Sequence, residues 1–158
     1  MKKQTRLLLF LTIIALLVSG CAHVMSKESR GLAAKKIPFQ WVAQNPEGYK
    51  GIMVIWGGQI IETQNLQDGT QIVVLQRPLG RSEQPIGDDK SGGRFLVIYK
   101  GFLDPAVYEK GQFITVAGII EGEKALPLGE IEYHYPYVNA REIHLWMADE
   151  MIQYYYSY

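Results

Sequence analysis

From about residue 37, apolar runs rich in β-branched and aromatic residues are separated by polar, turn-forming stretches, as is typical of β-strands. The pattern predicts five main strands, over residues 51–63, 70–77, 94–100, 112–121 and 128–137. Asp68-Gly69 favours a hairpin turn between the first two strands. A short further strand after Asn139, with Ile143 and Leu145 on one face, would be a sixth.

Glycine and proline mark the interruptions in this pattern. Gly57-Gly58 lies inside the first predicted strand, where two residues without side chains favour a bulge or a sharp bend. The glycines, prolines and acidic residues of 78–93 predict a long exposed loop. Asp104-Pro105 places a helix N-cap before a proline, so one short helical turn is expected through about Lys110, ended by Gly111.

Five strands with a small helical insertion between the third and the fourth predict an all-β fold. The layout matches a single small five- to six-stranded OB-like Greek-key barrel, in which the glycine pair supplies a bend. An open sandwich is the alternative. We assign this β domain to residues 37–147, while the tail 148–158 is either one helical turn or a frayed end.

The N-terminal residues follow a different pattern. A basic start with Lys2, Lys3 and Arg6 precedes an apolar run over 7–18 and the small residues Ser19-Gly20. This order is typical of a secretory signal peptide. The apolar run is well short of the ~20 residues that span a bilayer, which argues against an uncleaved anchor. We therefore predict a cleaved leader over residues 1–20.

The only cysteine of the chain, Cys21, follows this leader directly. Val18-Ser19-Gly20-Cys21 resembles the bacterial lipobox, an apolar residue and two small residues before an obligatory cysteine. The resemblance implies a diacylglycerol thioether on the Cys21 sulfur, cleavage before it, and acylation of the amino group that cleavage frees. A thiolate is the chain's best nucleophile for the thioether, and several acyl chains anchor a protein durably where one holds it marginally. An ordinary signal peptide with a chance cysteine, or a buried structural thiol, is the alternative.

The residues after Cys21 bear on where the protein is anchored. Ala22 stands where an aspartate tends to retain such lipoproteins in the inner membrane, so the resemblance implies lipid anchoring at the outer membrane with the body facing the periplasm. The implied partners are the bilayer itself and the lipoprotein processing and sorting machinery. Residues 21–36 are expected to form the lipidated N-terminus and a tether that holds the folded domain off the membrane surface.

Charge and cysteine content limit the remaining functions. The 16 basic and 16 acidic residues balance, but removal of the leader leaves 13 basic residues and a formal charge of −3. Such a surface gives no electrostatic reason to bind nucleic acid, which requires clustered lysine and arginine. A single cysteine also excludes an internal disulfide.

One face of the last predicted strand carries candidate catalytic groups. Glu130, Glu132 and His134 alternate there, and His144 could join them if the fold brought it near. Two carboxylates and an imidazole could do acid–base work or bind a metal, but the solvated face of an edge strand, which the alternation already predicts, is the better explanation. Asp104 is fully explained as an N-cap, and Gly57-Gly58 lacks phosphate-loop spacing. We expect no catalytic, metal or cofactor site, and no enzyme.

The opposite face of the same strand is apolar and aromatic. Ile131 and the tyrosine stripe Tyr133, Tyr135 and Tyr137 lie there. With Arg94 such a stripe could line a ligand groove, although barrel core or inter-strand packing is the commoner role. This keeps open a second hypothesis, an OB-like binding module for a small molecule, sugar or peptide.

Seven short segments follow one another along the chain in a distinctive order. They are "WGGQI" (56–60), Asn65 before "DGT", "RPLG" (77–80), "GRF" (93–95), "GFLDPAVYEKGQFITVAG" (101–118), "GEIEYHYP" (129–136) and "LW" (145–146). With the lipobox, this order resembles the Slp family of starvation-inducible outer membrane lipoproteins of Gram-negative bacteria. The resemblance implies a small lipid-anchored envelope protein with no established catalytic activity, associated with starvation or stationary phase. We therefore expect a non-enzymatic envelope protein whose ligand or protein partner the sequence does not name.

Overall fold

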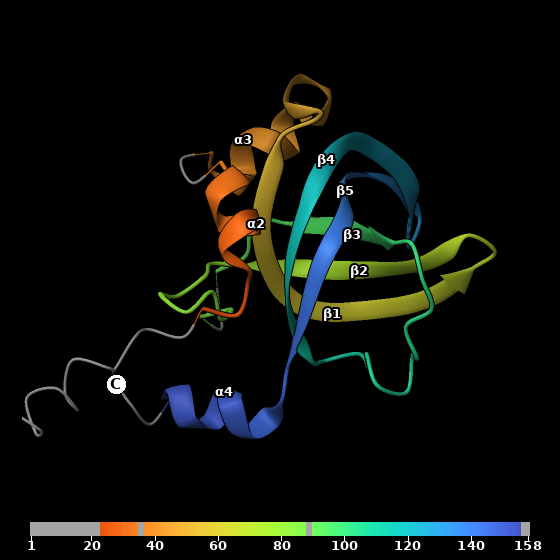
Figure 1. Cartoon of the computed structure of the whole chain (residues 1–158). Helices are drawn as coiled ribbons and strands as arrows, with labels where there is room; N and C mark the ends of the chain where they lie inside the picture. The colour runs from red at the N-terminus through yellow and green to blue at the C-terminus, as the bar shows by residue number, and fades with distance from the viewer. Residues whose placement is uncertain (1–22, 35–36, 88–89, 156–158) are drawn as a thin grey trace, which may run out of the picture.

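Five strands close into a barrel in the computed structural model, which describes residues 23–34, 37–87 and 90–155 (Figure 1). They are β1 (Met53–Leu66), β2 (Gly69–Arg77), β3 (Arg94–Tyr99), β4 (Phe113–Leu128) and β5 (Ile131–Trp146). Hydrogen bonds join them in the order β1-β2-β3-β5-β4, and β4 pairs with β1 to close the ring. Only β3 and β5 are parallel among the described pairs. The predicted five-stranded closed barrel is confirmed, and an open sandwich is excluded.

The last two strands are longer than the sequence suggested. β5 continues without a break, so the predicted sixth strand after Asn139 is wrong. A register shift beside Ala117 and Gly118 absorbs one extra residue of β5 there. β4 likewise runs on through Gly122, where the register shifts again. Bulges of this kind bend a strand without ending it, and the resulting hairpin extends beyond the ring.

The glycine pair in β1 allows three strands to approach closely. A Cβ atom on Gly58 would lie 2.0 Å from the carbonyl oxygen of Leu75 in β2. A Cβ atom on Gly57 would lie 2.8 Å from the carbonyl oxygen of Ile114 in β4. Figure 1 shows β1 curving strongly around the barrel in this way. The predicted bend is confirmed, while the bulge of β1 lies further on, between Ile60 and Glu62.

The interior of the barrel is filled by side chains that alternate inward along every strand. Fully buried members include Ile60 of β1, Ile72 and Val74 of β2, Phe95 and Val97 of β3, Ile114 and Val116 of β4, and Val138 of β5. Phe39, Trp56 and Phe95 form an aromatic group with ring centroids 4.8 to 5.9 Å apart. Phe39 belongs to a helix rather than to the sheet, so this group joins the barrel to an element outside it.

Helices account for more of the chain than the sequence predicted. They are α2 (Lys27–Leu32), α3 (Phe39–Gln44), the 3-10 helix η1 (Pro46–Tyr49) and α4 (Ala148–Tyr155). The expectation of β structure from residue 37 is therefore wrong for the α3–η1 stretch. Pro38 begins α3, and Asn45 caps η1 through a bond from the Gly48 amide. No helix in the described part of the chain is long and apolar enough to cross a membrane.

The helical insertion predicted between the third and fourth strands is a hydrogen-bonded turn and not a helix. The Asp104 carbonyl accepts bonds from the amides of Val107 and Tyr108, both at 2.9 Å. The Asp104 side chain accepts a bond from the Ala106 amide at 2.9 Å, as its predicted capping role requires. Gly111 follows with φ +97°, where glycine avoids the strain that other residues meet.

The tyrosine stripe packs on the outer face of the barrel. Tyr135 is buried beside Val73 and Leu96, which alternate with residues of the interior core. The Tyr133 and Tyr135 rings lie 4.6 Å apart, and the Tyr133 hydroxyl accepts a bond from the Arg94 amide at 3.2 Å. Inter-strand packing, rather than a ligand groove, therefore explains this stripe.

Candidate functional site

The segment that follows the lipobox is folded against the barrel. Met25 is only 3% exposed and packs on Met53 of β1 and Ala117 of β4. In Figure 1 α2 lies along the outside of the sheet, where β1 and β4 run side by side. The expectation of a tether over residues 21–36 is therefore wrong for residues 24–34, because an apolar methionine and a capped helix dock there instead.

The start of α2 is fixed by its own side chains. Ser26 is the N-cap, and its hydroxyl accepts a bond from the Ser29 amide at 3.1 Å. Glu28 lies in the first turn, where the helix dipole favours a negative charge. A six-residue helix is too short to be stable alone, so α2 depends on contacts with the barrel.

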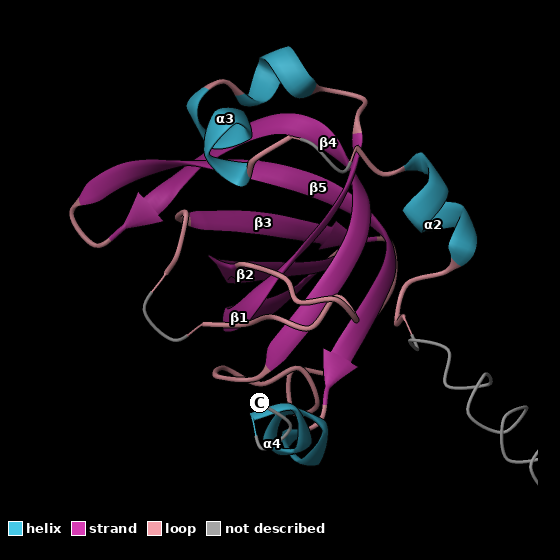
Figure 2. Cartoon of the chain, turned by 90° about the vertical axis from the view of Figure 1, so that its left-hand side faces the viewer, coloured by secondary structure: helices cyan, strands magenta, loops and turns pink. Residues whose placement is uncertain are grey.

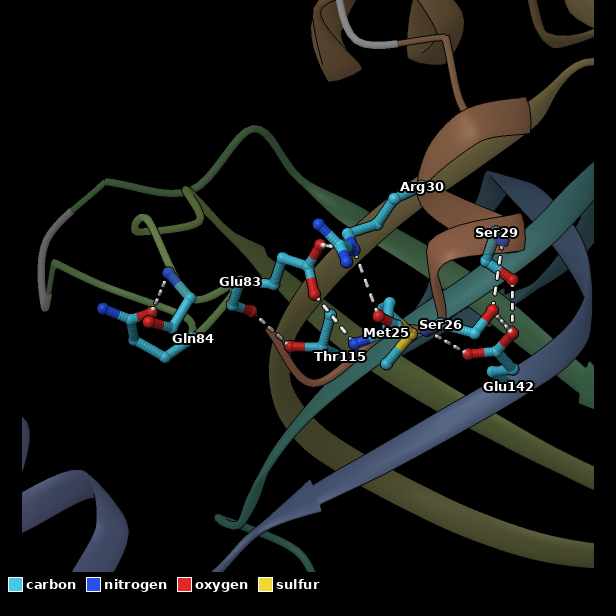
Figure 3. Close-up of polar contacts among 9 residues, drawn as sticks. Met25, Ser26, Ser29, Arg30, Glu83, Gln84, Thr115 and Glu142 are labelled. Atoms are coloured by element: carbon cyan, nitrogen blue, oxygen red, sulfur yellow. Dashed lines mark hydrogen bonds and ion pairs between the residues drawn. The ribbon is translucent and has the colours of Figure 1, made fainter. Parts of the chain in front are cut away.

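The carboxylate of Glu142 on β5 supplies these contacts (Figure 3). It accepts bonds from the Ser26 amide at 2.9 Å and from the Ser26 hydroxyl at 2.6 Å. The buried Ser29 donates its hydroxyl to the same carboxylate. Partial burial alone would raise the pKa of Glu142, but these hydrogen bonds to Ser26 and Ser29 outweigh it and hold the pKa below its usual value.

A second carboxylate, Glu83, holds the other side of the segment. It accepts a bond from the Met25 amide at 2.9 Å, and its other oxygen lies 3.9 Å from the Arg30 Nε. The same Arg30 Nε donates to the Met25 carbonyl at 3.2 Å. We call this set the N-terminal clamp: Met25, Ser26, Ser29 and Arg30 on the segment, with Glu83 and Glu142 on the barrel side.

The loop that carries Glu83 is itself held against the outer face of the barrel by buried side chains of β4 and β5. The Glu83 carbonyl accepts a bond from the Thr115 hydroxyl at 2.6 Å, and Thr115 is fully buried. The Trp146 indole donates to the Thr115 oxygen at 2.9 Å. Glu83 adopts φ +68°, a conformation that side chains other than glycine rarely take and that surrounding contacts must hold. Figure 3 shows this chain of contacts from β4 through the loop to the segment.

A cavity of about 430 Å³ adjoins the N-terminal clamp. Its apolar lining includes Ile37, Phe39, Trp56 and Leu79, and its charged lining is Arg30, Arg77, Arg81 and Glu83, together with His23. The charged side chains sum to +2 if the histidine is neutral, on a mature chain whose formal charge is −3. The Arg30 guanidinium contacts Met25 and Glu83 through its Nε, and its terminal nitrogens make no hydrogen bond or ion pair with the described residues. The cavity has the size and mixed lining of small-ligand sites.

The residues first considered for catalysis do not come together. His134 lies 2.9 Å from Glu123 and 3.7 Å from Glu132, and its side chain is 55% exposed. His144 lies ten positions further along the same strand, where it is 3.9 Å from Glu150 and packs against Trp146. Glu130 is exposed in the β4–β5 turn. Within the described ranges no three His, Cys, Asp or Glu side chains form a metal-ligand group.

The clamp was not anticipated from the sequence. One local signal was available, since Ser26 followed by Glu28 reads as the start of a helix. Glu83 and Glu142 had no such signal, because they meet the segment across 58 and 116 positions of sequence. Cys21 lies outside the described residues, so its lipidation stays a prediction.

Comparison with known proteins identifies the class. A model described as "Outer membrane lipoprotein Slp family" matches residues 18–158. The chain therefore belongs to the Slp family of outer membrane lipoproteins, as its short motifs predicted. The match begins at Val18, the first residue of the predicted lipobox.

Three relatives share part of this sequence. An uncharacterized protein of Haemophilus influenzae is 33% identical over 99 residues, which cover 62% of this chain and about half, 54%, of the relative. The uncharacterized lipoprotein YeaY of Escherichia coli is 27% identical over 87% of this chain and 71% of its own length. The outer membrane protein Slp of E. coli is 27% identical over 88% of this chain and 74% of its own.

Among solved structures, a small single-stranded DNA-binding protein from Streptomyces coelicolor is similar with a TM-score of 0.40 and 16% identity. The match covers 63% of this chain and 96% of that one.

Proposed function

We propose that this outer membrane lipoprotein is a non-enzymatic envelope module, anchored by acyl groups on Cys21 and held with its barrel close to the periplasmic surface of the bilayer. We also propose that it acts in starvation or stationary phase. Membership of the family establishes that the protein is a lipoprotein of the outer membrane. The particular anchor residue, the seating of the barrel and the physiological condition are parts of our proposal.

The observation that carries this proposal is the burial of Met25 four residues after Cys21. Four extended residues span at most ~14 Å, so a lipidated Cys21 would keep the barrel near the headgroups. The N-terminal clamp holds that short connection at both Glu83 and Glu142. A flexible tether would instead let the domain move far from the surface.

The absence of an enzymatic role is supported by the positions of the candidate groups. Glu132 and His134 lie on an exposed hairpin, and His144 contacts Glu150 at the far end of β5. Acid–base catalysis needs its groups within hydrogen-bond reach of one substrate atom. We further infer an OB-type barrel from the strand order β1-β2-β3-β5-β4 and the parallel β3–β5 pair.

The cavity supports a second candidate function, that of a binding module. Its volume and its combination of aromatic and arginine side chains suit a small molecule better than the exposed tyrosine groove considered from the sequence. This function is compatible with the lipid anchor, because both use the same side of the molecule.

Replacement of the anchor residue tests the leading proposal. In Cys21→Ser we expect loss of acylation, failure of lipoprotein processing and release from the outer membrane fraction. Ser26→Ala is the matched control, since it alters the clamp but leaves the lipobox intact. Intact-mass spectrometry and membrane fractionation give the result. An unmodified thiol in the native protein, or a Cys21→Ser chain that is still processed and membrane-bound, would overturn the proposal.

The physiological part has its own test. Immunoblots of the tagged protein from exponential, starved and stationary cells should show higher amounts in the latter two. Equal amounts in all three conditions would remove the link to starvation while leaving the anchor unaffected.

A further inference from the structure

We propose that the cavity beside the N-terminal clamp binds the phosphate headgroup of an anionic phospholipid, with Arg30 and Arg81 as its anion-binding side chains. The inference deepens the proposed function and rests on it, because a lipid anchor is what brings the cavity to the membrane. Neither the family nor its named relatives assign a ligand to this region.

The charge of the cavity favours an anion. Three of its four charged side chains are arginines, whereas the mature chain as a whole is acidic. Arg81 is exposed and makes no hydrogen bond or ion pair with the described residues, so no contact with them opposes its turning toward a ligand. Arg30 is held by Glu83 and Met25 through Nε, which leaves its terminal nitrogens for an incoming oxygen. Planar guanidinium groups bind phosphate oxygens in pairs.

The apolar part of the lining distinguishes an amphiphile from a free ion. Ile37 and Leu79 line the cavity beside the arginines and are only partly buried, while the buried Phe39 and Trp56 behind them belong to the barrel's aromatic group. A hydrated inorganic anion gains nothing from such a surface. The glycerol and first methylenes of a phospholipid would remove this surface from water.

The position of the cavity identifies the source of the amphiphile. His23, which lines the cavity, is two residues from Cys21, a span of at most ~7 Å. In Figures 1 and 2 the first described residues and α2 lie on the same side of the barrel as the loop that follows β2, which carries Arg81 and Glu83. Anchoring at Cys21 therefore places the cavity among headgroup phosphates, which are the most concentrated amphiphilic anions at that surface.

Native mass spectrometry of the full lipidated protein can test this inference. Protein in a neutral detergent is titrated with phosphatidylglycerol, with phosphatidylcholine, and with phosphatidylglycerol in the presence of inorganic phosphate. The variants are Arg81→Gln and the double variant Arg30→Gln with Arg81→Gln. Lys100→Gln is the control, because Lys100 is exposed and lies beside the β1–β2 turn, away from the cavity. The covalent mass reports the acyl anchor, while non-covalent adducts report the cavity, so the two proposals fail separately.

We expect phosphatidylglycerol adducts in preference to phosphatidylcholine, about a tenfold weaker apparent affinity in Arg81→Gln, and a larger loss in the double variant. Lys100→Gln should bind as the wild type does. Because Arg30→Gln also removes contacts of the N-terminal clamp, the affinity of the Arg81→Gln variant decides whether the inference holds. Equal adducts on all variants, or no preference over phosphatidylcholine, would overturn the inference. Displacement by inorganic phosphate at concentrations equal to the lipid would overturn the assignment to an amphiphile.

Discussion

Two groups of carboxylates on this barrel differ in what they contact. One group pairs with a histidine on an exposed hairpin, and the other binds the N-terminal segment. Glu132 and Glu123 flank His134 on the exposed β4–β5 hairpin, at distances of 3.7 and 2.9 Å. Glu83 and Glu142 bind the N-terminal segment where it packs on the barrel. Glu132 and His134 were candidates in the sequence because they lie two positions apart, whereas Glu123 was not. The second group fixes structure, because its partners bring backbone amides and buried hydroxyls that have few other acceptors.

The largest loss of stability should come from substitution of Thr115, which binds the Glu83 loop of the N-terminal clamp. In Thr115→Val both the Glu83 carbonyl and the Trp146 indole lose a buried partner. We expect the free energy of unfolding to fall by about 2 to 4 kcal/mol and the Glu83 loop to loosen. Thermal unfolding and hydrogen exchange measure these two effects.

Thr70→Val is a matched control for that change. Thr70 is also buried, and its hydroxyl bonds to Asn65 and to the Gly101 carbonyl on the opposite side of the barrel. It should lower global stability while leaving the amides of α2 protected. If both valine variants exposed α2 equally, the link from Thr115 to the clamp would be disproved.

Removal of the clamp carboxylate should have a smaller and more local effect. Glu142→Ala removes the acceptor of the Ser26 and Ser29 bonds. We expect the free energy of opening α2 to fall by about 1 to 2 kcal/mol, with faster hydrogen exchange and proteolysis confined to residues 24–34. Glu132→Ala, the matching change in the exposed group, should leave that segment unchanged. Equal protection of α2 in wild type and Glu142→Ala would show that apolar packing of Met25 alone holds the segment.

Acid should weaken the same contact. Glu142 has a lowered pKa in the folded protein, so its contribution is fully present above its unfolded value near 4.5 and is lost as the pH falls through the lower folded value. Opening of α2 should therefore become easier as the pH drops from about 6 to about 3. Glu142→Gln should flatten this dependence, as measured by pH-resolved hydrogen exchange. An identical acid response in both proteins would assign the effect to other carboxylates.

The exposed group should contribute least. His134→Ala removes ion pairs whose side chains are largely in solvent, so we expect a change of less than ~0.5 kcal/mol in the free energy of unfolding. Thermal unfolding at low and moderate salt is sufficient to measure it. A loss above ~1 kcal/mol would show that the hairpin depends on this histidine far more than surface pairs usually allow.

The sequence was sufficient where local chemistry decides the structure. The apolar runs of β2 and β3, the bend at Gly57-Gly58 and the cap at Asp104 were all predicted from neighbouring residues and are present. Prediction failed where distant contacts override local signals. β5 continues past Asn139 because a bulge opposite Ala117 and Gly118 preserves its pairing with β4. Phe39 lies in a helix because it joins Trp56 and Phe95 in one aromatic group.

The candidate site was harder to foresee than the fold. Arg30 lies in a helix about fifty positions before the loop that carries Arg81 and Glu83, so no spacing rule unites the three residues. The N-cap at Ser26 was readable, but its acceptor Glu142 was not. A polar residue beside a bulge gives no sign of what it will face until the chain is folded.

The closed ring of strands affects how copies of this protein can associate with one another at a membrane surface. Anchored proteins share a thin layer and meet one another far more often than the same number of free molecules would. A sheet with a bare border offers unpaired amides and carbonyls to its neighbours and invites fusion into fibrous assemblies. Here β1 bonds to β2 on one flank and to β4 on the other, so the closed part of the sheet presents no unpaired strand edge to neighbouring copies.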